Sequence, residues 1–364
     1  MNNVVASRKT SGFPPPLRVL SDMPPLWRDL DVDFDAGAEK FVRAHREDGE
    51  ARDLPVLDLR LFGVTEEKGF FALRPLLGHE PTRPLRSAAF SMLCARLGAP
   101  VEFLRDRLPA PVQLAALNVL LAQAEKSSGA TLRLRGNHVT AIVSERYAAL
   151  DAEELVQGLR EALVRHGLLG DVRVRGLATG MTDVLRLVLP SREEPVQVGD
   201  VTAVGLDIST SSFGRSSLQV RGTLWRLVCQ NGLRAPSNYG EYSFRHIGDP
   251  RRLRDGLADA VPSAIAQATG LLGKWRQAVH VYVDELSEQI DRMRELSVEE
   301  RHEVTAELQR DLAVPTLPER ASVYQITNAL TSAAQKSEPS RRLELETFAG
   351  GWLDQQVGGV HAGR

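Results

Sequence analysis

Residues 205–232 read GLDISTSSFGRSSLQVRGTLWRLVCQNG. Residue types with particular structural or chemical roles are more concentrated here than elsewhere in the chain. Two apolar runs flank a turn rich in serine, threonine and glycine, and three arginines lie within the stretch. Apolar runs on either side of such a turn are typical of paired strands. We therefore predict a strand, a hydroxyl-rich turn and a second element that ends at Asn231-Gly232.

Strand patterns extend towards the N-terminus from this stretch. Alternating apolar residues predict further strands at residues 172–177, 184–189 and 201–208, and a hairpin around Gly136-Asn137. Asp151 and Glu154 form a capping pair before an amphipathic helix. Together these signals predict an α+β fold: a central antiparallel or mixed sheet of about five strands flanked by helices, with a long helical C-terminal part.

Helical spacing dominates two other regions. Residues 85–123 predict two or three short helices, and Ser297 with Glu300 and Ser322 with Gln325 predict capped helices near the C-terminus. An apolar stripe from Ala268 to Met293 predicts one long helix with Pro262 in its first turn. This stripe is either an oligomer seam or the face that packs on the sheet.

Four regions are expected along the chain. They are an extended Pro-rich N-terminal arm (1–53), a small mixed or helical subdomain (54–130), the α+β sheet core (131–249) and a helical C-terminal region (250–364).

Composition restricts the class of protein. The charges of the 45 basic and 47 acidic residues nearly cancel, which excludes a protein with a large net positive charge. A surface that binds nucleic acid would therefore require an uneven distribution of charge. Cys94 and Cys229 lie far apart and match no metal or redox spacing. No apolar run is long enough for a membrane helix. We expect a cytoplasmic protein with no membrane association.

Arginines and aromatic residues alternate between residues 213 and 254, where acids are few. Arginines on one face neutralise phosphates, and aromatic rings stack on bases of single strands. The predicted nucleic-acid-binding residues are Arg215, Arg221, Arg226, Arg245, Arg251, Arg252, Tyr242 and Phe244. In the alternative interpretation the aromatics pack internally and the arginines are solvated or paired with the acidic C-terminal helices.

The turn at residues 210–217 is a candidate phosphate-binding turn, with Ser211, Ser212, Gly214 and Ser216 as its residues. A plain hairpin turn is the alternative, because no Gly-Lys-Ser/Thr follows as in a P-loop. The histidines are scattered and no metal-binding motif appears, so we expect no metal, no cofactor and no catalytic residues.

Several short motifs resemble a known family. They are Ser144-Glu145-Arg146-Tyr147 with Asp151, the segment around Gly214-Arg215-Ser216, Arg226-Leu227-Val228-Cys229-Gln230-Asn231-Gly232, Arg245-His246, and Asn328-Ala329-Leu330-Thr331 with Ala334. The chain is similar over residues 85–355 to the phage- and plasmid-like proteins grouped as a domain of unknown function numbered nine-three-two. Thr210-Ser211-Ser212 lacks an acid expected in relatives.

The resemblance implies no established reaction. In outline, the expected fold is similar to the RecT/Erf-type single-strand annealing proteins, an analogy of fold alone. We expect a non-enzymatic, sequence-tolerant protein that binds single-stranded DNA or RNA, of mobile-element or prophage origin, as a homo-oligomer that anneals strands. The alternative is an interaction or regulatory protein that assembles through its C-terminal helices in phage defence or plasmid maintenance.

Overall fold

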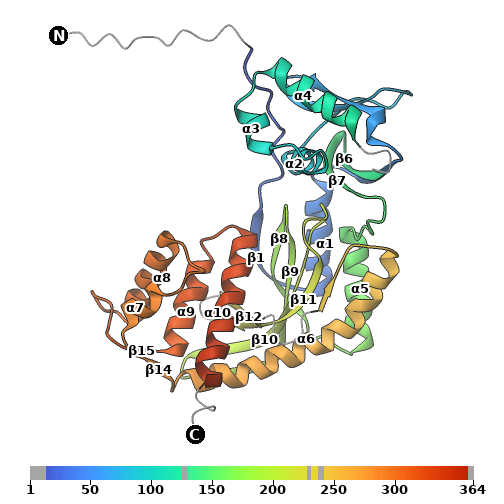
Figure 1. Ribbon diagram of the computed structural model, residues 1–364. Coiled ribbons are helices and arrows are strands. Elements are labelled where there is room, and N and C mark those ends of the chain that lie inside the picture. The colour runs from blue at the N-terminus through green and yellow to red at the C-terminus, as the bar shows by residue number, and fades with distance from the viewer. Residues whose placement is uncertain (1–13, 125–128, 228–230, 237–241, 360–364) are drawn as a thin grey trace, which may run out of the picture. The chain divides into compact units, whose positions relative to one another are not determined.

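The computed structural model describes residues 14–124, 129–227, 231–236 and 242–359, and it has the predicted α+β class (Figure 1). The chain divides into two compact units. The first combines Met1–Met23 with Asp48–Tyr147, and the second combines Pro24–Glu47 with Ala148–Arg364. The two units alternate along the sequence, because residues 24–47 of the second unit separate the two segments of the first.

The first unit contains the predicted hairpin and the predicted short helices. One three-stranded antiparallel sheet has the order β2-β6-β7 and another has the order β3-β4-β5. The elements are β2 (Ala51–Val56), η1 (Leu59–Leu61), β3 (Phe62–Glu67), β4 (Phe70–Pro75), β5 (Arg83–Pro84), α2 (Ser87–Arg96), α3 (Val101–Asp106), α4 (Ala110–Gln123), β6 (Ala130–Arg135) and β7 (His138–Ser144). The hairpin therefore belongs to this unit, and its placement in the central sheet was wrong.

The second unit is built on an antiparallel sheet whose described strands follow the order β1-β8-β9-β10-β11-β12, with β13 also pairing with β11. The strands are β1 (Leu26–Asp33), β8 (Arg173–Thr179), β9 (Asp183–Gln197), β10 (Asp200–Thr210), β11 (Leu218–Arg226), β12 (Asn231–Arg234) and β13 (Tyr242–Phe244). The predicted strands at 172–177, 184–189 and 201–208 are confirmed as β8, β9 and β10, and β8 begins one residue later than predicted.

The predicted N-terminal arm is wrong for residues 26–46, which form β1 and helix α1 (Phe34–Arg46). Asp33 caps this helix by accepting a hydrogen bond from the Ala36 amide at 2.8 Å. Phe34, Ala38 and Phe41 are buried at helical spacing. The proline restraint thus ends at Pro25, and the chain beyond it has an amphipathic pattern of its own.

Alternate residues of the central strands form two different faces. Leu185, Leu187, Leu206 and Val220 belong to the main hydrophobic core, and we call their side of the sheet the apolar face. The intervening residues include Arg186, Asp207 and Arg221, and we call that side the charged face. Helix α5 (Ala152–Arg165), with the predicted Asp151/Glu154 capping box, packs against α6 in the same core.

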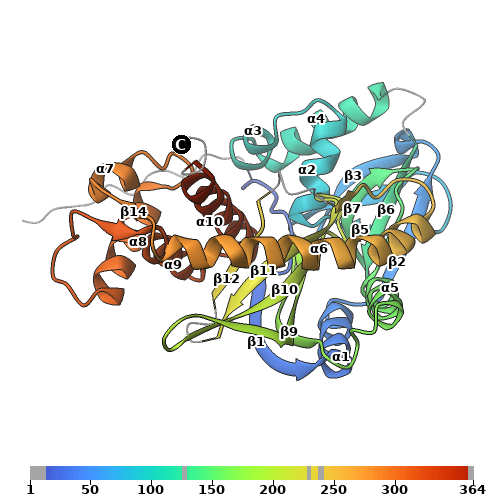
Figure 2. The ribbon, with the colours of Figure 1, turned by 90° about the horizontal axis from the view of Figure 1, so that it is seen from below.

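Helix α6 (Pro250–Ala278) crosses the apolar face (Figure 2). A Cβ on Gly222 of β11 would lie 2.3 Å from the Ala264 carbonyl oxygen, so only glycine allows this close approach. Pro262 lies inside the helix, not in its first turn as predicted. Because proline cannot donate to the Ala258 carbonyl, His166 Nε2 does so instead at 2.8 Å.

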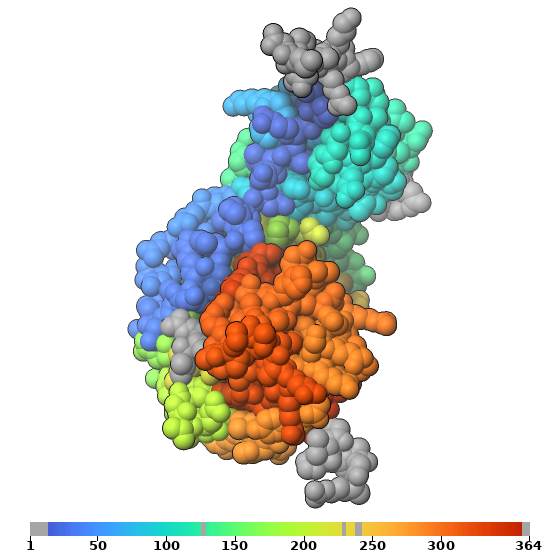
Figure 3. Space-filling view, turned by 90° about the vertical axis from the view of Figure 1, so that its left-hand side faces the viewer, coloured from blue at the N-terminus to red at the C-terminus, as the bar shows by residue number. Residues whose placement is uncertain are grey.

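The predicted long helix from Ala268 to Met293 ends at Ala278. It is followed by β14 (Tyr282–Val283), α7 (Leu286–Asp291), α8 (Val298–Asp311), β15 (Ala321–Ser322), α9 (Val323–Ala334) and α10 (Pro339–Gly359). The predicted capping boxes of α8 and α9 are confirmed. Leu272, Trp275, Leu286 and Ile290 are buried in the unit's own core, so the stripe packs internally. This C-terminal segment is orange to red in Figure 3 and covers a broad part of the surface seen there.

Candidate functional site

The predicted basic residues fall into two groups. Arg215, Arg245, Arg251 and Arg252 are exposed, and none of these four side chains forms an ion pair or hydrogen bond within the described residues. We call these four the basic edge. Arg221 and Arg226 instead lie on opposite faces of β11 and are turned into the protein. The six predicted arginines therefore do not share one exposed face.

The contacts of the two inner arginines explain their positions. Arg226 Nε lies 2.8 Å from the carboxylate of Asp200, and its guanidinium group stacks over the Tyr324 ring at 5.6 Å. Arg221 is 7% exposed and donates to the Gln219 side chain and the Ala235 carbonyl at 3.4 and 3.5 Å. Neither guanidinium group is therefore exposed for contact with an extended nucleic-acid strand.

The basic edge is formed by segments that meet at one end of the sheet. Leu218, three residues after Arg215, pairs with Phe244, the neighbour of Arg245. Ser217 and Ser243 share a 2.6 Å hydrogen bond between their hydroxyl groups. His246 accepts from Thr210 at 2.9 Å and donates to the Ala148 carbonyl at 3.0 Å, which anchors the segment that leads to Arg251 and Arg252.

Arg251 and Arg252 lie in the first turn of α6. Asp249 is the N-cap of this helix and accepts from the Arg251 amide at 3.0 Å. The N-terminus of a helix carries partial positive charge, so it adds to the field of the two guanidinium groups. The acidic neighbours Glu154 and Asp249 line a cavity of about 400 Å³ beside Arg251, and they bound the positive surface on that side.

The aromatic side chains predicted to stack on bases are used for packing. Phe244 contacts Gly256 of α6, where a Cβ would lie 2.5 Å from its ring. Tyr242 shares a 2.9 Å hydrogen bond with Ser263 of α6, and both rings pack against the main core. Trp225 is buried. These observations agree with the alternative interpretation, in which the aromatics pack internally.

The hydroxyl-rich turn directs its donors towards the protein interior. The Ser211 hydroxyl donates to the Met181 carbonyl at 2.9 Å and accepts from the amides of Phe213 and Arg215. The Ser212 hydroxyl donates to Asp183 at 2.6 Å, and Asp183 also pairs with His45 at 3.0 Å. Gly214 has the positive φ of +69° that the turn requires. The Ser211 hydroxyl thus donates to a backbone carbonyl and the Ser212 hydroxyl to a carboxylate of the chain itself, so these two groups are not available to an external phosphate.

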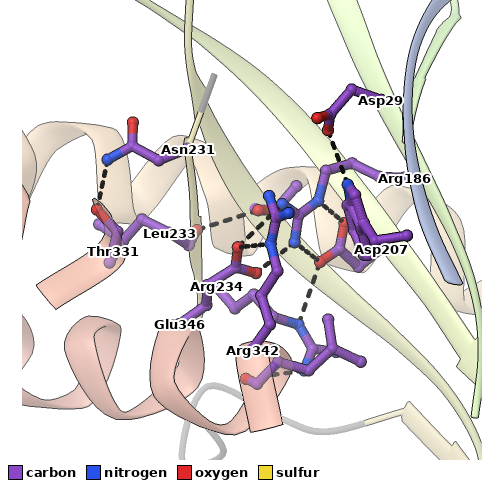
Figure 4. A network of polar contacts seen from close by, with 12 residues as sticks. Asp29, Arg186, Asp207, Asn231, Leu233, Arg234, Thr331, Arg342 and Glu346 are labelled. Carbon is purple, nitrogen blue, oxygen red and sulfur yellow. Dashed lines mark hydrogen bonds and ion pairs between the residues drawn. The ribbon is translucent and has the colours of Figure 1, made fainter. Parts of the chain in front are cut away.

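A buried charge network that the sequence did not reveal lies on the charged face (Figure 4). Arg186 donates to both oxygens of Asp207 at 2.7 and 2.6 Å and to both oxygens of Glu346 on α10. Arg342 donates to Glu346 at 3.0 Å, and Arg234 Nε lies 3.2 Å from Asp207. Arg186 also lies over the rings of Trp27 and Trp225, each at 5.1 Å. The network therefore joins the strands to α10.

Electrostatics keep this network ionised. Burial pushes the pKa of Asp207 upwards, but Arg186 and Arg234 outweigh it, so the pKa of this carboxyl lies below its usual range. Burial likewise disfavours the charged form of Arg186, and Asp207 and Glu346 together reverse that effect and raise its pKa. Bidentate guanidinium–carboxylate geometry of this kind gives strong, directional pairs.

The end of the stretch at residues 205–232 contributes to the same assembly. Asn231 donates to Thr331 of α9 at 2.6 Å. A Cβ on Gly232 would lie 2.3 Å from Arg186 Nη1, so glycine leaves the room that the guanidinium group occupies. Two motifs that carry the family resemblance, at residues 226–232 and 328–331, therefore meet in space. Cys229 of the first motif lies outside the described residues.

The described residues show neither a cluster of metal ligands nor a membrane-spanning helix. No group of three or more histidine, cysteine or acidic residues is arranged to hold a metal ion among the described residues. Within them, no helix combines the length and apolar content needed to span a lipid bilayer.

Comparison with known proteins identifies one family. No curated protein and no solved structure was found to match the chain. A family model described as "Domain of unknown function (DUF932)" matches residues 139–344, which is more than half of the 364 residues. The match covers α5, the strands β8 to β13 and the helices from α6 to the start of α10. The chain therefore belongs to the DUF932 family.

Proposed function

We propose that this protein binds single-stranded DNA in a sequence-tolerant manner through the basic edge. The observation that carries the proposal is the set of four exposed arginines, without partners among the described residues, on segments that meet at one end of the sheet. Unpaired guanidinium groups attract phosphates and release the counterions condensed on a strand. The proposed activity is binding without a chemical step.

The geometry also predicts how a strand is bound. Tyr242 and Phe244 pack on α6, so they do not supply the base-stacking surface expected from the sequence. Binding through phosphates alone depends little on base identity and strongly on salt. A Phe244→Leu variant should therefore keep its affinity for DNA, provided that its packing on Gly256 is maintained.

Fluorescence anisotropy with a labelled, mixed-sequence oligonucleotide tests the proposal at low and moderate salt. The Arg251→Gln/Arg252→Gln double variant should bind about tenfold more weakly, and the slope of log affinity against log salt should fall by about 0.7 for each phosphate that is no longer neutralised. Arg294→Gln is the matched control, because Arg294 is also exposed and lies in the segment between α7 and α8, outside the basic edge. Wild-type protein that binds at neither salt concentration would exclude the function, and unchanged affinity of the double variant would exclude this surface.

We extend the proposal to annealing of complementary strands by a homo-oligomer. A protein that holds strands by their phosphates leaves the base edges free to pair, and assembly would bring two strands together. Energy transfer between two labelled complementary strands measures the annealing rate, and light scattering measures the mass of the assembly. A competing RNA strand of the same sequence shows whether the surface distinguishes RNA from DNA.

A further inference from the structure

A second polar surface lies on the charged face of the sheet, beneath α10. It is a pocket of about 390 Å³, and we call it the α10 pocket. Two guanidinium groups and several hydroxyl groups line it, contributed by Arg221, Arg234, Ser209, Ser216, Ser340 and Thr347. None of these residues belongs to the basic edge.

Positive charge exceeds negative charge around this pocket. Among the described residues, the buried guanidinium groups of Arg186, Arg234 and Arg342 share the two buried carboxylates of Asp207 and Glu346. Three cations against two carboxylates leave an excess of one positive charge within this group of five side chains. Glu344 at the rim is mostly exposed and pairs with Arg341 at 2.9 Å. A buried charge without a counter-charge is costly, so an anion in the pocket would be stabilised.

Two donors at the pocket lack an acceptor among the described residues. Arg234 is 3% exposed; its Nη1 donates to Thr347 at 3.2 Å and to the Leu343 carbonyl at 3.4 Å, whereas its Nη2 has no hydrogen-bond partner. The buried hydroxyl oxygen of Ser216 also has no hydrogen-bond partner. Buried polar groups are almost always hydrogen-bonded in native proteins, so unpaired donors from two elements indicate a ligand with acceptor oxygens.

Burial lowers the pKa of Arg234 to about 10 despite the nearby Asp207. The guanidinium group is therefore still charged at neutral pH, but its environment disfavours that charge. A bound anion would remove this penalty.

We propose that the α10 pocket binds a phosphate group, with Arg221 and Arg234 supplying the charge and Ser216 an added donor. Guanidinium groups from adjacent strands, together with hydroxyl donors, suit a tetrahedral oxyanion that accepts several hydrogen bonds. The pocket is larger than one phosphate group, so a phosphorylated organic molecule also fits. The phosphate is either that of a free phosphomonoester or the 5′ end of a nucleic-acid strand.

Isothermal titration calorimetry of the full chain at constant ionic strength tests this site, with inorganic phosphate, AMP and adenosine as probes. Inorganic phosphate and AMP should bind, and adenosine should not. Arg221→Gln should weaken phosphate binding at least tenfold and Ser216→Ala about threefold. Arg294→Gln, which removes an exposed charge outside both proposed binding surfaces, is the matched control and should leave phosphate binding unchanged.

The two sources of phosphate are separated by comparing 5′-phosphorylated and 5′-hydroxyl oligonucleotides of one sequence. Tighter binding of the phosphorylated strand, with an advantage that falls in Arg221→Gln, identifies a strand end. Equal binding of the two strands identifies the free phosphomonoester. The proposal fails if neither phosphate nor AMP binds, or if neither Arg221→Gln nor Ser216→Ala weakens phosphate binding. The basic edge is tested with an oligonucleotide and the Arg251→Gln/Arg252→Gln variant, whereas the α10 pocket is tested with inorganic phosphate, AMP and other variants. Failure of one proposal is therefore distinguishable from failure of the other.

Discussion

The apolar and charged faces of the central sheet are formed by alternate residues of the same strands, yet they hold their helices by different means. On the apolar face, α6 packs over Leu206 and Val220 and approaches the backbone at Gly222. On the charged face, α10 is joined to the strands by Arg186, Asp207 and Glu346, and it approaches the backbone at Gly350, where a Cβ would lie 1.9 Å from the Arg234 carbonyl oxygen.

The comparison shows which face tolerates change. Hydrophobic contacts are non-directional, so the apolar face can partly relax around a smaller side chain. A buried ion network has no such freedom, because removal of one partner leaves an opposite charge in a medium of low polarity. The charged face should therefore be the more fragile of the two, although it contains less apolar surface.

The largest effect is expected from Glu346→Gln. This change keeps the shape of the side chain but removes the carboxylate shared by Arg186 and Arg342. We expect unfolding free energy, measured by urea denaturation, to fall by about 3–5 kcal/mol. Glu344→Gln, two residues away and exposed, is the control and should cost less than about 1 kcal/mol. Equal losses in the two variants would contradict the proposed fragility of the charged face.

A somewhat smaller loss is expected from Leu206→Ala on the apolar face. Leu206 is fully buried under the helices of the main core, and a truncated leucine costs about 2–4 kcal/mol, according to how far its surroundings collapse. Val198→Ala, at the exposed turn between β9 and β10, should change stability by less than about 0.5 kcal/mol. A larger loss for Leu206→Ala than for Glu346→Gln would reverse the order of the two faces.

His166→Ala should lower the free energy of unfolding by about 1–2 kcal/mol, because the Ala258 carbonyl loses its hydrogen-bond donor. A double-mutant cycle with Pro262→Ala isolates the cause. Alanine at this position has an amide that can donate to Ala258 within the helix, so the loss caused by His166→Ala should shrink in the Pro262→Ala background. Additive losses would show that His166 acts through other contacts.

The smallest effect on stability is expected from the protonation of Asp183 at acid pH. Burial raises the pKa of Asp183, but the charge and hydrogen bond of His45 and the Ser212 hydroxyl outweigh it, so the pKa lies below its usual 3.8. A lowered carboxyl pKa in the folded state contributes stability that is present above 3.8 and is lost as the pH falls through the folded value.

Stability from urea curves should therefore be level between about pH 5 and 7 with respect to Asp183 and fall below pH 3.8. Asp183→Asn should be less stable at neutral pH and lose less on acidification than the wild type. Leu206→Ala should keep the wild-type pH dependence, since its loss comes from apolar packing. Parallel acid curves for Asp183→Asn and the wild type would contradict this assignment.

The elements that the sequence predicted best are those specified by neighbours in the chain. The capping boxes at Ser297 and Ser322 depend on residues three positions apart, and the hairpin depends on Gly136-Asn137. Helix α1 was missed although Asp33 and the buried spacing from Phe34 to Phe41 were visible signals. The end of α6 at Ala278 was missed because the apolar spacing continues through a change of element.

The charge network was missed because its partners are distant in sequence. Asp207 and Glu346 lie 21 and 160 positions from Arg186. A charged residue between apolar neighbours, as in Leu185-Arg186-Leu187 and Leu206-Asp207-Ile208, normally indicates a strand with one solvated face. Only the position of α10, which no local pattern specifies, shows that this face is covered.

The alternation of the two units along the sequence determines the order in which they can be completed on the ribosome. Every residue of the first unit has been made once Tyr147 is added. Strand β1 is made early, but its partner β8 follows far later; the ion pair between Asp31 and Arg173 spans 142 positions. The first unit can therefore fold during synthesis, while residues 24–47 wait unpaired until the strands after residue 172 emerge.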